Sequence, residues 1–310
     1  MAQMKNSIVL LALAIVFTMH VALFQRYYQQ DQLLAAAANP RIIDTTIPLQ
    51  PSEDWKPVYV YRGGPQHHLE QVWNGQVEQD KLISWLTKNK TNGYFVDLAA
   101  NGAEILSNTI SLERHFNWNG LCIEANPSYW HELGRLRSCT VVGAAIGKHA
   151  NDKILFSMRG TGGGIAGDTF DNKVDDKTAI TEERFTAQLD KTFEQFHVPK
   201  VIDYLSLDVE GAEDYIMGAF PFESYRFRFL TVERPSPELT KKLAEHGYRY
   251  IKKLVFFGDT LFAHESELPI DEAIIDRYCK ESGGKYCGEE PNMAGFRFSA
   301  MTKTLQNGGG

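Results

Sequence analysis

Residues 94–109 read YFVDLAANGAEILSNT, and the fold prediction starts from this stretch. A short apolar run carries an acid, Asp97, at its end; the chain then turns through Ala-Ala-Asn-Gly into residues with helical spacing. A strand, a turn and a helix in this order begin many sheets that bind nucleotide-like cofactors. Only Gly102 stands in the turn, where several glycines usually let the backbone approach a pyrophosphate. The turn therefore favours a cofactor without phosphate.

The rest of the chain alternates between strand-like and helical runs. Such alternation predicts an α/β fold whose parallel sheet is covered on both faces. One segment, Thr181–Phe196, has helical spacing throughout, and the last two runs are joined by Gly258-Asp259, a hairpin turn signal. We expect five parallel strands and a C-terminal antiparallel hairpin, from apolar runs near residues 94–98, 120–124, 139–147, 201–208, 226–233 and 248–264.

Acids stand at the ends of four of the five expected parallel strands: Asp97, Glu124, Asp208 and Glu233. Ligands of open α/β sheets bind beyond the carboxyl ends of the strands. An acid after the second strand, here Glu124, can accept hydrogen bonds from both hydroxyls of a ribose. S-adenosylmethionine has a ribose, no phosphate and a positively charged sulfonium. It is the predicted cofactor, and an NAD-dependent oxidoreductase is disfavoured because the phosphate turn is absent.

Several blocks together resemble one known family. YFVDLAANGAEILSNTISLERHFNWNGLCIEANP, VVGAAIG, YLSLDVEGAE and GDTLFAH are similar to the FkbM-type S-adenosylmethionine-dependent methyltransferases, in order and with sensible spacing from Trp73 to His264. The resemblance implies a Rossmann-like class I methyltransferase sheet. It also implies transfer of a methyl group to a hydroxyl, often on a sugar or a polyketide-type natural product.

The resemblance also implies roles for individual residues. Asp97, Ala99, Asn101 and Gly102 would lie beside the methionine part of the cofactor, Ser107 and Asn108 at its amino-acid end, and Glu124 and Asn126 at its ribose. The block with Asp208, Glu210 and Glu213 would border the methyl-transfer site. The chain departs from the family where Gly-Ala-Asn-Asp-Gly is common, because Ala99 adds a methyl group and Gly102 replaces the second acid.

Transfer to a poorly nucleophilic hydroxyl needs help to remove its proton. Asp208 is the predicted base, with Glu210 as the second catalytic candidate. We assign no metal; as an alternative, Asp208 and Glu233 hold Mg²⁺ through their oxygens. The glycine-rich RGTGGGIAG (residues 159–167) is expected to be a lid or acceptor loop. His264 and the pair His67-His68 are either acceptor-side groups or plain surface residues.

The first 57 residues differ in composition from the rest. Residues 7–24, SIVLLALAIVFTMHVALF, carry no charge, and 18 helical residues span roughly 27 Å. We expect an uncleaved signal anchor in residues 1–24, a stem in 25–57 and the methyltransferase domain in 58–310; a cleaved signal peptide is the alternative. The anchor predicts a membrane protein of the endoplasmic reticulum or Golgi with a lumenal domain.

Charge and cysteines add further expectations. The net charge of −7 without a basic block argues against nucleic-acid binding. Cys279 and Cys287 are either a disulfide closing a small loop or two thiols, and Cys122 is expected to be packed in a strand. Asn89-Lys90-Thr91 is a glycosylation sequon.

The predicted function is a membrane-anchored S-adenosylmethionine-dependent O-methyltransferase that acts on a hydroxyl of a glycan or glycoconjugate. A small-molecule or lipid hydroxyl is an alternative acceptor. A rival from another class is a catalytically inactive methyltransferase fold that serves as a binding or trafficking partner, a hypothesis motivated by the altered turn.

Overall fold

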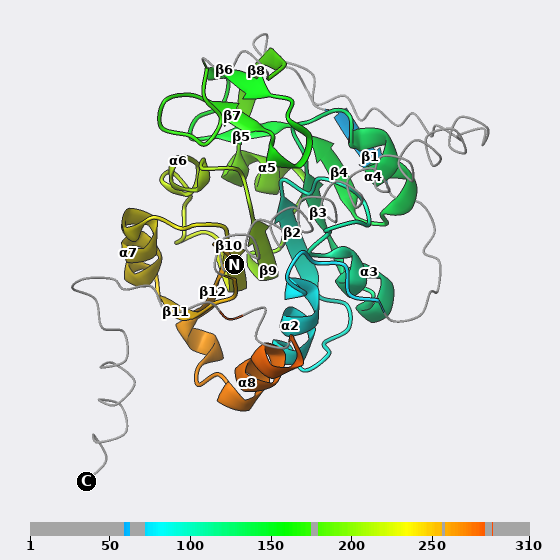
Figure 1. The fold of residues 1–310 in the computed structure, drawn as a ribbon, viewed down its shortest axis with the longest axis vertical. Helices are drawn as coiled ribbons and strands as arrows, with labels where there is room; N and C mark the ends of the chain where they lie inside the picture. The colour runs from blue at the N-terminus through cyan, green and yellow to red at the C-terminus, as the bar shows by residue number, and fades with distance from the viewer. Residues whose placement is uncertain (1–58, 63–71, 175–178, 256–257, 283–286, 288–310) are drawn as a thin grey trace, which may run out of the picture. The chain divides into compact units, whose positions relative to one another are not determined.

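A computed structural model describes residues 59–62, 72–174, 179–255, 258–282 and 287. Helices and strands alternate along this part of the chain, as an α/β fold requires (Figure 1). The elements are β1 (Tyr59–Arg62), α2 (Gln79–Leu86), β2 (Tyr94–Leu98), α3 (Ile110–Phe116), β3 (Asn119–Ile123), α4 (Trp130–Leu136), β4 (Thr140–Gly143), β5 (Ala145–Gly147), β6 (Lys153–Ser157), η1 (Gly160–Gly162), β7 (Gly164–Ala166), β8 (Thr181–Gln188), α5 (Leu189–Gln195), β9 (Val201–Leu207), α6 (Glu213–Met217), β10 (Arg226–Val232), α7 (Pro237–Glu245), β11 (Tyr248–Lys253), β12 (Thr260–His264), η2 (Glu265–Glu267) and α8 (Glu272–Glu281).

The main sheet has eight strands in the order β1-β4-β3-β2-β9-β10-β12-β11. The five strands from β4 to β10 are parallel, as predicted. The C-terminal hairpin is also confirmed, since β11 and β12 pair antiparallel. Its second strand, β12, inserts between β10 and β11 and is antiparallel to both. The sheet reverses its strand order between β2 and β9, and ligands bind at such a switch point in open α/β sheets.

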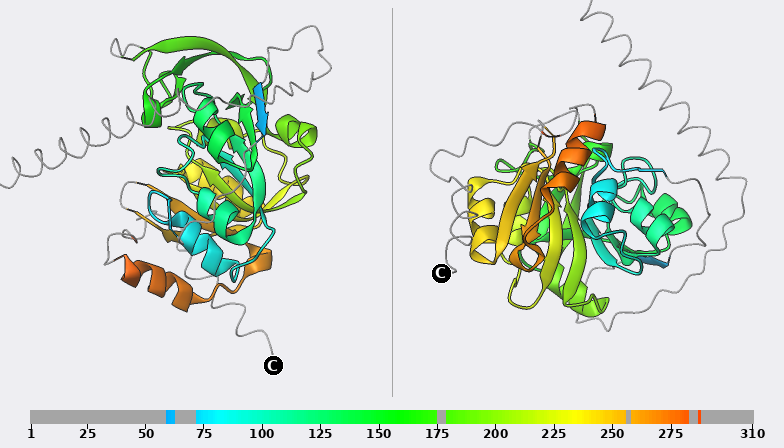
Figure 2. Two further views of the ribbon diagram at one scale, coloured as in Figure 1. Left: turned by 90° about the vertical axis from the view of Figure 1, so that its right-hand side faces the viewer. Right: turned by 90° about the horizontal axis from the view of Figure 1, so that it is seen from below.

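Two apolar cores cover the two faces of this sheet. Alternating residues of each strand enter different cores: Phe95 and Tyr204 belong to one, Val96 and Leu205 to the other. The first core takes side chains from α2, α3, α4 and α8, and the second from α5, α6 and α7. Helices α2 and α8 contact each other although they lie at opposite ends of the domain sequence (Figure 2). Burial on both faces explains the nearly continuous apolar runs of the parallel strands.

A second, four-stranded sheet has the order β5-β8-β6-β7 and lies at the end of the domain away from α8 (Figure 1). The helical prediction for Thr181–Phe196 is wrong in its first half, which forms β8; only Leu189–Gln195 is helical. β8 pairs with β6 over five residues and with β5 over three, so tertiary pairing overrides helical spacing here. The run CTVVGAAIG also divides at Ala144 into β4 and β5 of different sheets.

Of two predicted helix starts, one is confirmed and the other is wrong. Helix α7 begins as predicted: Ser236 accepts a hydrogen bond from the backbone N–H of Leu239 at 2.9 Å, and Pro237 follows it. Helix α3 begins only at Ile110, so Ile105 is in a loop and 47% exposed instead of on the helix face. The preceding residues are held by side-chain hydrogen bonds to the site, described below.

The predicted anchor, the stem and the pair His67-His68 lie outside the described residues. In the part that the structure describes, no helix is both long and apolar enough to cross a membrane. Cys279 and Cys287 form a disulfide, so of the two readings the bonded one is correct.

Candidate active site

A cavity of 220 Å³ lies at the carboxyl ends of the central parallel strands. Its walls come from the turn after β2, the residues after β3, β4, β9 and β10, and the glycine-rich segment of the second sheet. Of the predicted site residues, those that line it are Asp97, Ala99, Asn101, Asn108, Glu124, Asp208, Glu210 and Glu233.

Backbone hydrogen bonds beyond the strand ends bring these residues to one edge. The N–H of Ala99 donates to the carbonyl of Ile123, that of Asp208 to Leu98, and that of Glu233 to Leu207. Each bond continues the parallel ladder by a residue. Acids far apart in the sequence therefore meet at the same edge of the sheet.

Glu124, directly after β3, is 5% exposed and faces the cavity. Its two carboxylate oxygens accept backbone N–H groups, Oε2 from Asn101 at 2.8 Å and Oε1 from Asn126 at 2.6 Å. Burial raises the pKa of Glu124 to about 7. The backbone N–H of Ala125 also bonds this carboxylate. Since a carboxylate has about four lone-pair sites, Glu124 keeps about one acceptor position for a ligand.

Asp97 accepts hydrogen bonds from the side chains of Thr109 and Ser206. The Thr109 hydroxyl donates to Asp97 Oδ2 at 2.6 Å and accepts from Arg137 Nη2 at 2.7 Å. Arg137 is fully buried and also pairs with Glu113 at 3.1 Å. Burial raises the pKa of Asp97, while the Arg137 charge and the Thr109 hydrogen bond oppose this shift. Sequence reasoning did not find Thr109 or Arg137 as parts of the site.

The turn after β2 has a left-handed backbone at Ala99, with φ 68°, and at Asn101, with φ 55°. Asn tolerates this region, whereas Ala pays a steric cost there and Gly does not. Ala99 thus occupies, in a strained conformation, a position where the resembling family has Gly. Beyond the turn, Asn108 donates through Nδ2 to Ser206 Oγ at 3.0 Å, and its Oδ1 is buried without a hydrogen-bond partner.

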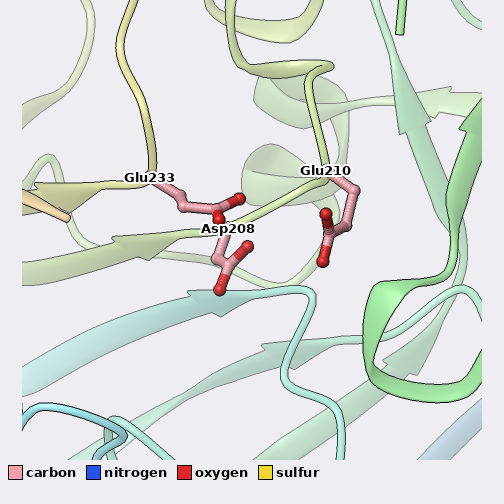
Figure 3. Close-up of side chains that lie close together, drawn as sticks. All are labelled: Asp208, Glu210 and Glu233. Carbon is pink, nitrogen blue, oxygen red and sulfur yellow. The ribbon is translucent and has the colours of Figure 1, made fainter. Parts of the chain in front are cut away.

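Three acids converge at the other end of the cavity, where Asp208, Glu210 and Glu233 each bring a carboxylate oxygen within 4.8 Å of the others (Figure 3). Burial raises the pKa of Asp208 well above its usual range, and the Glu233 charge adds to the shift. Arg234 Nη2 pairs with Glu233 at 2.8 Å and with Glu210 at 3.2 Å. Glu210 itself has φ 55°, so the chain turns sharply after β9 to place this side chain.

Four of the expected site residues do not line the cavity. Ser107 is buried and accepts from Arg137 Nη1 at 3.1 Å. Asn126 accepts at its side chain from Ser128, and Gly102 lies in the turn backbone. Glu213 accepts from the N–H of Val209 at 3.1 Å and so closes the turn before α6. These positions stabilise the site's loops instead of facing a ligand.

The glycine-rich segment lies against the acids. Gly160 to Gly164 line the cavity, and a Cβ placed on Gly164 would come within 3.1 Å of the Glu210 Cβ. A side chain at Gly164 would push its neighbours apart by a few tenths of an ångström, so glycine favours the close approach of this segment to the loop after β9. The segment expected to be a lid or acceptor loop forms one wall of the cavity. His264, by contrast, is outside the lining and bonds Ser266 through Nδ1.

The ionisable side chains that line the cavity among the described residues are all acidic. Five carboxylates line it, and none of the described lining residues is Lys, Arg or His. When its carboxyl groups are ionised, such a wall repels phosphates and attracts a cation.

The comparisons with known proteins agree with the motif blocks. Residues 97–250 match the family model of the methyltransferase FkbM domain. The chain carries a methyltransferase FkbM domain. The predicted family resemblance is confirmed, and the FkbM domain spans the strands from β2 to β11 that build the cavity.

No curated protein matches this sequence significantly. Among solved structures, the precorrin-6y C5,15-methyltransferase from Geobacter metallireducens GS-15 is 12% identical, with a TM-score of 0.37 over 64% of this chain and 92% of that chain. A likeness at this level does not indicate a shared reaction.

Proposed function

We propose that the chain is an S-adenosylmethionine-dependent O-methyltransferase, anchored to a membrane by residues 7–24, that methylates a hydroxyl of a glycan or glycoconjugate. The observation that carries the proposal is the cavity of the FkbM domain, with its five carboxylates and no basic side chain among the described lining residues. A sulfonium cofactor without phosphate matches this charge.

The cofactor would extend across the switch point between β2 and β9. Glu124 keeps an acceptor position that a ribose hydroxyl can use. The unpartnered Oδ1 of Asn108 is an acceptor for the cofactor's ammonium group, and Asp97 adds negative charge near it. Ala144 to Ile146 form an apolar wall beyond Glu124 that suits an adenine ring. When bound, the cofactor supplies an electrophilic methyl group.

The acceptor hydroxyl would approach the end of the cavity lined by Asp208, Glu210 and Glu233. We assign Asp208 as the base that takes the hydroxyl proton. Its raised pKa, caused by burial and by Glu233, makes it a stronger base than an ordinary carboxylate. Glu210 would orient the acceptor, and the glycine-rich wall would hold it close and exclude water.

A divalent ion is the alternative use of the same acids. Hard cations such as Mg²⁺ prefer carboxylate oxygens, and the structure adds Glu210 to the two acids expected from the sequence. Arg234 already compensates part of their charge. Loss of activity with a chelator, restored by Mg²⁺, would favour the ion over a proton-accepting Asp208.

A lumenal location of the domain in the endoplasmic reticulum or Golgi is supported by three features. Residues 7–24 are apolar and uncharged, the Cys279–Cys287 disulfide fits an oxidising compartment, and the sequon residue Asn89 is exposed. Glycans are abundant hydroxyl acceptors in that compartment. The strained Ala99 in the turn supports the rival proposal of an inactive binding partner.

Calorimetric titration of the full-length chain with S-adenosylhomocysteine separates these two proposals. Micromolar binding, weakened at least tenfold by Glu124→Ala, supports the enzyme; Glu182→Ala on exposed β8 is the control. If the folded chain does not bind S-adenosylhomocysteine, the proposal of an inactive binding partner is favoured. Transfer of radiolabelled methyl groups to a glycan panel and to small-molecule alcohols then tests the acceptor class.

A further inference from the structure

Cys122 and Cys139 lie closer together than two unbonded sulfur atoms normally approach. Cys122 is in β3, Cys139 precedes β4, and both are fully buried. Their Sγ atoms are 2.6 Å apart. A disulfide bond measures about 2.05 Å, so a shift of roughly 0.6 Å would bring the sulfurs to bonding distance.

The sheet register explains why the two side chains meet. Leu121 pairs with Thr140 in the parallel ladder, so Cys139 stands across from Gly120. Gly120 and Cys122 lie on the same face of β3, because side chains alternate along a strand. Cys139 faces no side chain at Gly120 and reaches Cys122 diagonally. The register places both side chains on one face of the sheet, and their rotamers bring the sulfurs together.

We infer that Cys122 and Cys139 are joined by a disulfide in the mature protein. This inference goes beyond the proposed methyl transfer and does not depend on it. With the Cys279–Cys287 bond, it would pair all four cysteines of the chain. The expectation that Cys122 is packed in a strand is met, but packing is then only part of its role.

The bond would form during folding, before the strands close. In the folded chain both thiols are inaccessible, and burial raises the pKa of Cys139 well above its usual range. The oxidant is a small-molecule or protein disulfide. One cysteine thiolate attacks it and releases a thiol; the second cysteine then attacks the mixed disulfide and releases the other. The chain loses two protons and two electrons, and the oxidant gains them.

The position of the bond connects it to the cavity. Two residues after Cys122 comes Glu124, and β4 lies between Cys139, which precedes it, and Ala144 of the apolar wall, which follows it. A covalent link at this point fixes the spacing of the two strands that carry the proposed ribose and adenine walls.

Peptide mapping tests the inference. The full-length chain is unfolded and reduced, refolded in detergent with reduced and oxidised glutathione, alkylated without reduction and digested with trypsin. Trypsin cuts after Arg135 and Arg137, so the expected product links peptide 115–135 to peptide 138–148. The internal control is the link between peptides 278–280 and 286–297. Four cysteines allow three pairings, and only one contains both links.

Separately alkylated 115–135 and 138–148 peptides overturn the inference, whether or not the control link is found. Either of the other two pairings also overturns it. Thermal unfolding gives a second readout. We expect the Tm of the oxidised chain to exceed that of the reduced chain by about 6–12 °C from this bond. The difference should persist in C279S/C287S, whereas in C122A/C139A only the part that comes from the Cys279–Cys287 bond should remain. A shift that survives C122A/C139A unchanged would contradict the inference.

Discussion

The Thr109 hydroxyl joins the buried Arg137 guanidinium to Asp97, with oxygen–oxygen and nitrogen–oxygen distances of 2.6 and 2.7 Å. An acid that lines the cavity is thus positioned by a cation that does not itself line it. This arrangement keeps positive charge out of the cavity while it orients the carboxylate.

Thr109→Val should therefore weaken cofactor binding. The substitution keeps the shape but removes one of the two side-chain hydrogen bonds to Asp97 and the acceptor of Arg137, at a cost of about 1–2 kcal/mol, or roughly 5- to 30-fold in affinity. The measurement is calorimetric titration with S-adenosylmethionine. Thr192→Val removes a comparable buried hydroxyl, which donates to the Gln188 carbonyl away from the cavity, and serves as the control. Equal affinities for the two variants would refute the positioning role.

Cofactor binding should also depend on pH through Glu124. Its pKa is raised to about 7, so below that pH the unliganded carboxyl is protonated. Protonation of Glu124 turns an acceptor oxygen into a donor, and a sulfonium favours negative charge, so binding should select the ionised form. Affinity should fall by up to about tenfold for each pH unit below 7.

Glu124→Gln should bind weakly and lose this pH dependence. Glu213→Gln is a matched control, because burial also raises the pKa of Glu213 to about 7 although it does not line the cavity. Calorimetric titration with S-adenosylmethionine between pH 5.5 and 8 measures the pH dependence of cofactor affinity for both variants. A pH dependence that vanishes in Glu213→Gln and persists in Glu124→Gln would exclude the ribose assignment.

Ala99→Gly should stabilise the chain. Glycine relieves the left-handed strain at φ 68° but increases the entropy of the unfolded chain, leaving a net gain of about 0.5–1 kcal/mol. Thermal unfolding should show a Tm higher by roughly 2 °C. The neighbouring Ala100 is buried and has no left-handed backbone, so Ala100→Gly should lower the Tm. A decrease for both variants would show that Ala99 is not strained.

Asp208→Asn should separate binding from chemistry. If Asp208 takes the acceptor proton, methyl transfer falls by about 10²–10⁴-fold while cofactor affinity changes little. Initial rates with an acceptor found in the glycan screen, paired with calorimetry, measure both. Transfer that persists at the wild-type rate would remove Asp208 from the mechanism.

Much of the central sheet follows from local patterns. The apolar runs of β2, β3 and β9 are buried on both faces, so their signal is strong in the sequence, and the acids after them indicate the ligand edge. β8 is different: its residues alternate less clearly, and its pairing with β6 is a long-range contact that helical spacing conceals.

The cavity lining was predictable where a residue stands at a strand end, as Asp97, Glu124 and Asp208 do. Ser107, Asn126 and Glu213 sit beside such positions in the sequence, yet their side chains bond protein loops. Arg137 could not be assigned, because only the packing of α4 against the sheet brings it to Thr109. The one available signal was the basic end of that helix, which reads as ordinary surface charge.

The insertion of β12 between β10 and β11 has a consequence for synthesis. β11 joins the sheet only through β12, and the outer edge of β10 has no other strand partner in the described sheet. As the chain leaves the ribosome, β10 is exposed as an unpaired edge until residues 260–264 emerge, and such edges recruit other strands. A nascent chain shortened before β12 is thus open to mispairing even though every residue that lines the cavity has already been made.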